Sequence, residues 1–264
     1  MTSPLRMANN SQRWPDLLWI VRHGESAGNV ARDAADAAGL QMIDIDVRDV
    51  DVLLSPLGER QAEALGRWFA TLPDDRRPTV VLVSPYQRAL RTAEIVRDAG
   101  GLCPEADEFV VDERLREKEF GILDRLTRVG IEHRHPEQAE LRRLLGKFYH
   151  RPPGGESWCD VILRLRSALD TISLHYARGE RVLIVCHQVI VLCLRYLVEC
   201  MSEEQILEID RRAEIANCSI TAYEFDPAAG KQGKLRLTAF NFVAPLEAEG
   251  AAVTSAPDVK GVRG

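Results

Sequence analysis

The chain has 264 residues, of which 45% are hydrophobic and 28% are charged, the balance typical of a globular protein. Lysine and arginine total 34 against 40 aspartates and glutamates, and the resulting net charge of −6 argues against a nucleic-acid partner. No apolar run approaches the roughly 18 residues of a membrane span, so we expect no membrane partner either.

Apolar runs and helix-start signals alternate along the chain. Residues 1–16 are polar and are expected to form a flexible arm. Three continuous apolar runs and two later alternating segments predict strands: 17–21, 79–83, 182–186, 219–225 and 235–240. N-cap serines predict helices from Pro56 to about Leu72, from Ser157 to about His175, and after Ser202. A further helix is predicted over Tyr86–Asp98.

This order of elements predicts one α/β domain over residues 17–243 with a mainly parallel sheet. The segment 244–264 is rich in alanine, glycine and valine and is expected to be a disordered tail. The six cysteines show no C-x-x-C spacing, and several lie in apolar runs, which indicates buried free thiols. Free thiols favour a reducing compartment, so we predict a cytoplasmic protein.

Reactive side chains follow three of the predicted strands. Arg22-His23 ends the first, Ser84 through Arg88 follows the second, and His187-Gln188 follows the third. Because the carboxyl ends of parallel strands meet at one edge of a sheet, these groups are expected to converge there.

These residue types suit phosphoryl chemistry. Histidine can act as a nucleophile or a proton donor, and arginine offers a fork of donors for phosphate oxygens. A helix or loop start around Ser26 and Asn29 would add further donors. A lone histidine after a strand is more often structural, but the combination predicts a phosphate pocket.

Four segments carry a resemblance to a known family. The run Val21–Asn29, with Leu57–Ala62, Ser84–Ala93 and Pro153–Ser157, resembles the histidine phosphatase superfamily, the phosphoglycerate-mutase-like proteins, over Leu18–Phe225. The resemblance implies a three-layer α/β/α sandwich and a phosphohistidine intermediate, with no metal and no other cofactor.

The resemblance also implies roles for individual residues. His23 would be the nucleophile, and Glu117 the general acid and base, with Glu119 as the competing choice. The groups that would contact the phosphoryl oxygens or the substrate are Arg22, Arg88, His187, Asn29, Ser26 and Gln188.

Two branches of the family compete. Cys186-His187-Gln188 and the segment after Glu117 are similar to the fructose-2,6-bisphosphatase branch, which implies that Arg142 and Lys147 hold a second phosphate or acidic group. Two departures from that branch are Leu192 in place of an arginine, for which Arg195 is a candidate substitute, and Arg128 in place of a tyrosine.

The phosphoglycerate mutase branch shares the entry motif but usually has Ala-His-Gly at the second histidine. We therefore favour hydrolysis of a small phosphorylated metabolite over transfer. A non-catalytic phosphate-binding module and a phosphoprotein phosphatase are further alternatives. Dimers are common in the family, although the sequence identifies no interface.

The segment Val30–Leu54 is acidic and looks longer than its counterpart in the family. We interpret it as a solvated loop, with a lid over the phosphate pocket and a metal site as alternatives.

Overall fold

The computed structural model describes residues 12–106 and 108–255. Its strands are β1 (Leu17–Arg22), β2 (Val80–Val83), β3 (Phe109–Val111), β4 (Arg181–Cys186), β5 (Ile220–Asp226) and β6 (Lys234–Phe242). Its α-helices are α1 (Ala27–Ala37), α2 (Pro56–Ala70), α3 (Gln87–Asp98), α4 (Arg128–Arg134), α5 (Pro136–Tyr149), α6 (Trp158–His175), α7 (Gln188–Val198), α8 (Glu203–Arg212) and α9 (Ala244–Ala248).

The strands form one sheet in the order β3-β2-β4-β1-β5-β6. The pairs among β1, β2, β3 and β4 are parallel, whereas β5 runs antiparallel to β1 and β6 antiparallel to β5. Arg22 lies opposite Cys186 in the register of β1 and β4. The mainly parallel sheet is therefore confirmed, and the residues that follow β1, β2 and β4 emerge at the same edge.

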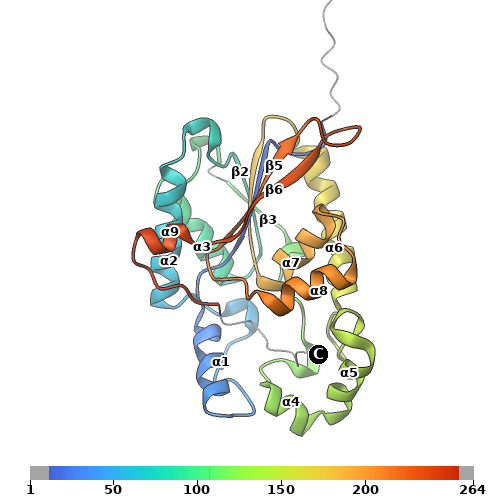
Figure 1. Ribbon diagram of the computed structural model, residues 1–264. Helices are drawn as coiled ribbons and strands as arrows, with labels where there is room; N and C mark the ends of the chain where they lie inside the picture. The colour runs from blue at the N-terminus through green and yellow to red at the C-terminus, as the bar shows by residue number, and fades with distance from the viewer. Residues whose placement is uncertain (1–11, 107, 256–264) are drawn as a thin grey trace, which may run out of the picture.

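Helices cover both faces of the sheet (Figure 1). Alternate residues of β1 explain this: Leu18 and Ile20 pack with α6 and α7, while Trp19 and Val21 pack with α2 and α3. Since both faces are buried, the strands are continuously apolar rather than alternating. The three-layer α/β/α architecture is confirmed.

Capping explains where the predicted helices begin. The side chains of Ser55, Ser157 and Ser202 each accept a hydrogen bond from the backbone N–H three residues later. These bonds satisfy amide groups that the first helical turn leaves without a partner. The helix starts read from the sequence therefore agree with the structure.

A smaller group of helices lies beyond the carboxyl end of the parallel strands. There α1, α4 and α5 gather at one end of the molecule (Figure 1). An isolated bridge between Met42 and Leu126 ties the segment after α1 to the segment before α4. This group faces the edge of the sheet where the reactive side chains emerge.

Three expectations about irregular segments need correction. Residues 27–37 form α1, so the acidic segment is not a loop throughout. Trp14 packs against the core at the end of the expected arm, and residues 1–11 lie outside the described residues.

The expected tail is also ordered in its first part: α9 buries Leu246, and Thr254 accepts a hydrogen bond from the backbone N–H of Asn217. Residues 256–264 lie outside the described residues. The composition of the tail was misleading because a single buried leucine and hydrogen bonds to distant residues hold it in place.

Candidate active site

His23 lies directly after β1 and is fully buried. Its backbone N–H donates to the Cys186 carbonyl at 2.9 Å, which extends the pairing with β4 by one residue. Its Nδ1 lies 2.6 Å from the Gly24 carbonyl oxygen. Because a carbonyl can only accept, Nδ1 carries the proton of the neutral ring, and Nε2 holds the lone pair.

Nε2 of His23 points toward Arg88, whose Nε donates to it at 3.2 Å. Arg88 is the second residue of α3 and is 1% exposed. Its guanidinium also lies over the ring of Tyr86, 4.9 Å from the centroid. The reactive nitrogen of the proposed nucleophile is thus in contact with a cation that suits a phosphoryl oxygen.

His187 follows β4 and forms the N-cap of α7. Its ring centroid is 5.1 Å from that of His23, and its Nε2 lies 2.8 Å from Oγ of Ser84. Arg22, the last residue of β1, donates through Nη1 to the Ile215 carbonyl at 2.6 Å. The structure therefore brings the reactive groups that follow the three strands together.

Glu117 lies after β3 and is 1% exposed. Its Oε1 accepts from the backbone N–H of Lys118 at 2.7 Å. After burial, the charge of Glu117 is the next cause that raises the pKa of the Cys186 thiol at the end of β4. Glu119, in contrast, is exposed and accepts a hydrogen bond from the Tyr86 hydroxyl at 3.1 Å.

Ser26 and Asn29 cap the N-terminus of α1. The two residues form a capping box, in which Ser26 accepts from the Asn29 backbone N–H and Asn29 Oδ1 accepts from the Ser26 backbone N–H. Both side chains are buried beside the turn that carries His23. Gln188 begins α7, is 9% exposed, and its Oε1 has no hydrogen-bond partner among the described residues.

The acidic segment contributes a contact that the sequence did not predict. Nη1 of Arg88 donates to the Asp49 backbone oxygen at 2.6 Å and to Oδ1 at 3.0 Å, and Nη2 donates to Oδ2 at 3.2 Å. The side chain of Asp49 is 46% exposed. Asp49 is therefore solvent-exposed, as expected for a solvated loop, but its carboxylate also pairs with the guanidinium of the buried Arg88.

A further missed residue is Arg32, one turn after Asn29 on α1. It is 1% exposed and lines the same pocket as Ser26, Asp49 and Arg88. The spacing of three residues from Asn29 on a helix was the available signal, since such residues share one face.

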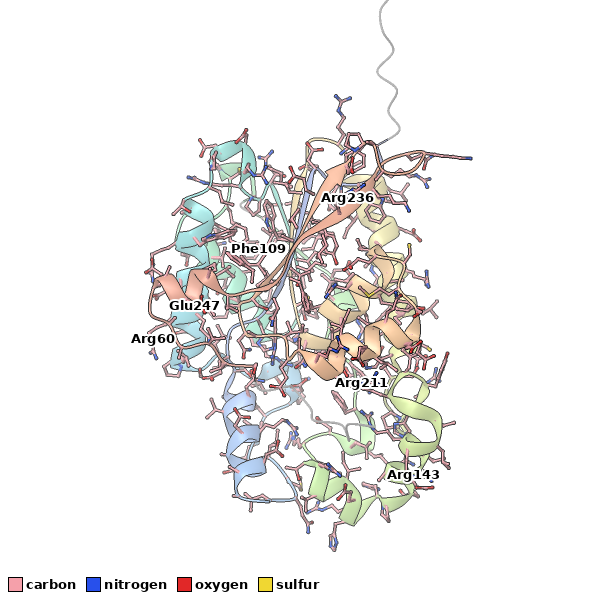
Figure 2. All side chains as sticks on the ribbon, in the orientation of Figure 1. Arg60, Phe109, Arg143, Arg211, Arg236 and Glu247 are labelled. Atoms are coloured by element: carbon pink, nitrogen blue, oxygen red, sulfur yellow. The ribbon has the colours of Figure 1, made fainter. Side chains whose placement is uncertain are left out.

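A second group of cations lies near Glu117. Lys147 forms an ion pair with Asp210 of α8, and burial lowers its pKa in spite of that partner. Burial also lowers the pKa of Arg142, whereas Arg143 lies on the outer side of α5 and pairs with Glu140 (Figure 2).

Lys118 belongs to the same group and was not predicted. It is 5% exposed, and its Nζ lies 4.3 Å from the centroid of the Phe120 ring. Burial and the charge of Arg142 lower the pKa of Lys118 to about 8. Among the described residues no acceptor is within hydrogen-bond distance of its ammonium group.

Arg195, the candidate substitute for the arginine that Leu192 replaces, does not join these groups. Arg195 donates to Glu199 at 2.7 Å and stacks on Phe240, and Leu192 is buried in the core. In the described part of the chain, no group of three or more His, Cys, Asp or Glu side chains could hold a metal ion. None of the described helices is both long and apolar enough to cross a membrane.

The family model described as histidine phosphatase superfamily (branch 1) matches residues 18–237. The chain belongs to this superfamily. A probable phosphoglycerate mutase of Yersinia enterocolitica is 30% identical over 210 residues, which cover 79% of this chain and 84% of the relative.

Relatives of the other branch are equally similar. A probable fructose-2,6-bisphosphatase of Schizosaccharomyces pombe is also 30% identical, over 72% of this chain but only 40% of its own length. The solved structure of Bacillus stearothermophilus YhfR is 25% identical, covers 87% of this chain and 98% of its own, and has a TM-score of 0.65. Identity therefore shows the histidine phosphatase superfamily without separating its two branches.

Proposed function

We propose that this chain hydrolyses the phosphomonoester of a small metabolite through a phosphohistidine intermediate on His23. The observation that carries the proposal is the contact between Nε2 of His23 and Nε of Arg88 at 3.2 Å, beside the ring of His187. A ring nitrogen with a lone pair and a guanidinium group meet there, and both side chains are buried.

The first step is attack by Nε2 of His23 on phosphorus. The hydrogen bond from Nδ1 to the Gly24 carbonyl fixes the tautomer that presents a lone pair at Nε2. As the N–P bond forms, the bond to the ester oxygen breaks in line with it. Arg22, Arg88 and His187 would stabilise the charge that spreads over the equatorial oxygens, and Asn29 would donate a further hydrogen bond.

Glu117 would donate its proton to the departing alkoxide. The resulting carboxylate would then take a proton from the water that attacks phosphohistidine, which releases phosphate and restores His23. The burial of Glu117 supports this role for it over the exposed Glu119.

The leaving group would carry a second anionic group. Arg142 and Lys147 were the expected cations for it, but the ammonium of Lys147 already pairs with Asp210. We therefore propose that Lys118 joins Arg142 in this role, with Lys147 contributing less because its charge is balanced. Ser26 and Gln188 would contact the substrate at the edge of the phosphoryl pocket.

Phosphoryl transfer between two substrate positions is the second candidate function. The similarity to a probable phosphoglycerate mutase favours it. A phosphatase passes the phosphoryl group from His23 to water, whereas a mutase returns it to the substrate.

The test compares wild type with His23→Ala in the presence of EDTA. Substrates are p-nitrophenyl phosphate, fructose 2,6-bisphosphate, 3-phosphoglycerate and a phosphopeptide. We expect phosphate release from a small metabolite, lowered on the order of 10³-fold or more in the variant, because the covalent route is deleted. His133→Ala, which removes an exposed histidine of α4, is the matched control and should retain full activity.

The other outcomes are equally informative. Unchanged release in His23→Ala would overturn the nucleophile. Isomerisation of 3-phosphoglycerate after priming with 2,3-bisphosphoglycerate, without phosphate release, would establish the mutase. Preference for the phosphopeptide would point to a phosphoprotein phosphatase, and binding of phosphate without turnover to a binding module.

The cytoplasmic location accompanies this proposal as a prediction, and a homodimer, common in the family, is an option to be tested. Light scattering of the full chain during size-exclusion chromatography would test the dimer. Fractionation of the source cells would test the location.

A further inference from the structure

A chain of hydrogen bonds connects the segment after β6 to the turn that carries His23. We propose that Thr254 is a positioning residue that holds this turn, and thereby Nδ1 of His23, in its reactive arrangement. The inference rests on the proposed function, in which His23 is the nucleophile.

The turn His23-Gly24-Glu25 is held at each of its three residues. Nδ2 of Asn217 donates to the His23 carbonyl at 3.1 Å. The Gly24 N–H donates to Thr92 at 3.1 Å, and the Glu25 N–H donates to Oε1 of Gln61 at 2.8 Å. Asn217 and Gln61, at the two ends of the turn, are both fully buried.

Thr254 joins these two amides. Its Oγ1 accepts from Nε2 of Gln61 at 3.0 Å and donates to Oδ1 of Asn217 at 3.1 Å. Only a group that both donates and accepts can make this connection, and a hydroxyl is such a group. The backbone carbonyl of Thr254 also accepts a hydrogen bond from the Asn217 N–H at 2.8 Å. Thr254 and Asn217 are therefore joined by two hydrogen bonds, which closes a ring of contacts.

The geometry of the turn decides the state of the nucleophile. Nδ1 of His23 donates to the carbonyl of Gly24, the central residue of the turn. If the turn relaxes, that carbonyl moves, and the ring can shift its proton to Nε2 or rotate away from phosphorus. Thr254 would therefore act through Asn217 and Gln61 on the chemical step rather than on phosphate binding.

The backbone of this turn packs closely against the start of α2 and has little room to move. A Cβ added to Gly24 would lie 2.5 Å from the Gly58 carbonyl oxygen, so the start of α2 is in direct backbone contact with the turn. Gln61 lies one turn further along α2. The hydrogen bonds of Gln61 and Thr254 are thus made against a rigid helix, which suits a positioning role.

The experiment compares Thr254→Val, which keeps the shape, with Thr254→Ser, which keeps the hydroxyl. We expect Thr254→Val to lower kcat for p-nitrophenyl phosphate about 5- to 10-fold, the effect of losing one buried hydrogen bond, with KM changed less than about twofold. Thr254→Ser should stay within about twofold of wild type. Ser255→Ala is the control from the same segment, since Ser255 contacts Glu214 and lies outside this ring of contacts.

A spectroscopic measurement separates positioning from a general loss of stability. In protein labelled with ¹⁵N-histidine, the Nδ1 and Nε2 shifts report the tautomer of His23, assigned by comparison with His23→Ala. We expect the Nε2-protonated fraction to increase in Thr254→Val and not in Thr254→Ser or Ser255→Ala.

An unchanged His23 spectrum in Thr254→Val, or equal losses in all three variants, would overturn the inference. Loss of activity in His23→Ala with full activity in Thr254→Val would also overturn it while leaving the proposed function intact. Full activity in His23→Ala would instead reject the proposed function.

Discussion

The edge of the sheet and the group of cations near α5 differ in how their charged residues are held. At the edge, the arginines and histidines follow strands whose register is fixed, and hydrogen bonds to backbone or neighbouring side chains orient them. Near α5, Lys147 is balanced by Asp210, whereas Lys118 is buried without an acceptor among the described residues. The helix itself is interrupted at Gly146, whose φ is +77°.

This difference separates two tasks. Phosphoryl transfer needs groups that are fixed before the substrate arrives, because reorganisation during the reaction costs rate. Recognition of an anionic leaving group is favoured by a buried cation that has no anionic partner until the substrate binds. The ammonium group of Lys118 is such a cation. The sheet edge should therefore control kcat, and the group near α5 should control which substrate is preferred.

After His23→Ala, the largest effect should come from Glu117→Gln at the sheet edge. The amide cannot donate an acidic proton, so we expect a loss on the order of 10²- to 10³-fold for alkyl phosphates and a smaller one for p-nitrophenyl phosphate. An aryl oxide is a good leaving group and needs less protonation. Steady-state kcat values for both substrate types test this.

Glu119→Gln is the matched control for that prediction. Glu119 is exposed; its carboxylate accepts a hydrogen bond from the Tyr86 hydroxyl and forms an ion pair with Arg116. We expect its substitution to change kcat less than about threefold. A larger loss in Glu119→Gln than in Glu117→Gln would reverse the assignment.

Local patterns made the sheet edge predictable. Apolar runs end where Arg22 and His187 begin, and serine caps mark helix starts, so three strand ends could be aligned without knowing the fold. The short strand β3 was missed because three residues give no periodicity. A helix or loop start was expected around Ser26 and Asn29, but the helix over the following residues was assigned to a solvated loop because its aspartates outweighed its alanines.

Non-local contacts explain the remaining failures. Lys118 stands in the run Arg116-Glu117-Lys118-Glu119, which resembles a solvated surface until packing buries two of its four residues. Thr254 stands in a composition typical of disorder, and its importance depends on Asn217 and Gln61, each more than 30 residues away in sequence. No spacing rule connects such residues.

A smaller effect, on substrate preference, should follow from Lys118→Met near α5. We expect kcat/KM for fructose 2,6-bisphosphate or another doubly anionic substrate to fall about tenfold, while that for p-nitrophenyl phosphate changes less than about twofold. The pKa of Lys118 is lowered to about 8, so its positive charge is present below that pH and lost as the pH rises through it. The preference of wild type for the doubly anionic substrate should therefore decline between about pH 7 and pH 9.

Lys118→Met should abolish that decline, and Arg143→Met on the outer side of α5 should not (Figure 2). Measuring kcat/KM for both substrates across the pH range tests the prediction. A preference that stays constant with pH in wild type, or an equal loss on both substrates in Lys118→Met, would place Lys118 outside the recognition of the leaving group.

The smallest effect concerns Asp49, which connects the acidic segment to the sheet edge. Its carboxylate holds the fork of Arg88 that the phosphoryl oxygens need, so binding must displace it. Asp49→Asn keeps the shape and removes the charge. Because the pair is partly exposed, we expect the KM for p-nitrophenyl phosphate and the inhibition constant of phosphate to fall only about 3- to 5-fold.

Salt should reduce this gain, since the Asp49 charge is open to screening ions. Asp51→Asn is the control, because Asp51 lies in the same segment and pairs with the exposed Arg48 instead of Arg88. Weaker phosphate binding in Asp49→Asn would mean that the carboxylate orients Arg88 for the substrate rather than competing with it. Asp49 would then be one of the residues that hold the catalytic groups in place before the substrate binds. The acidic segment would contribute to catalysis together with the sheet edge.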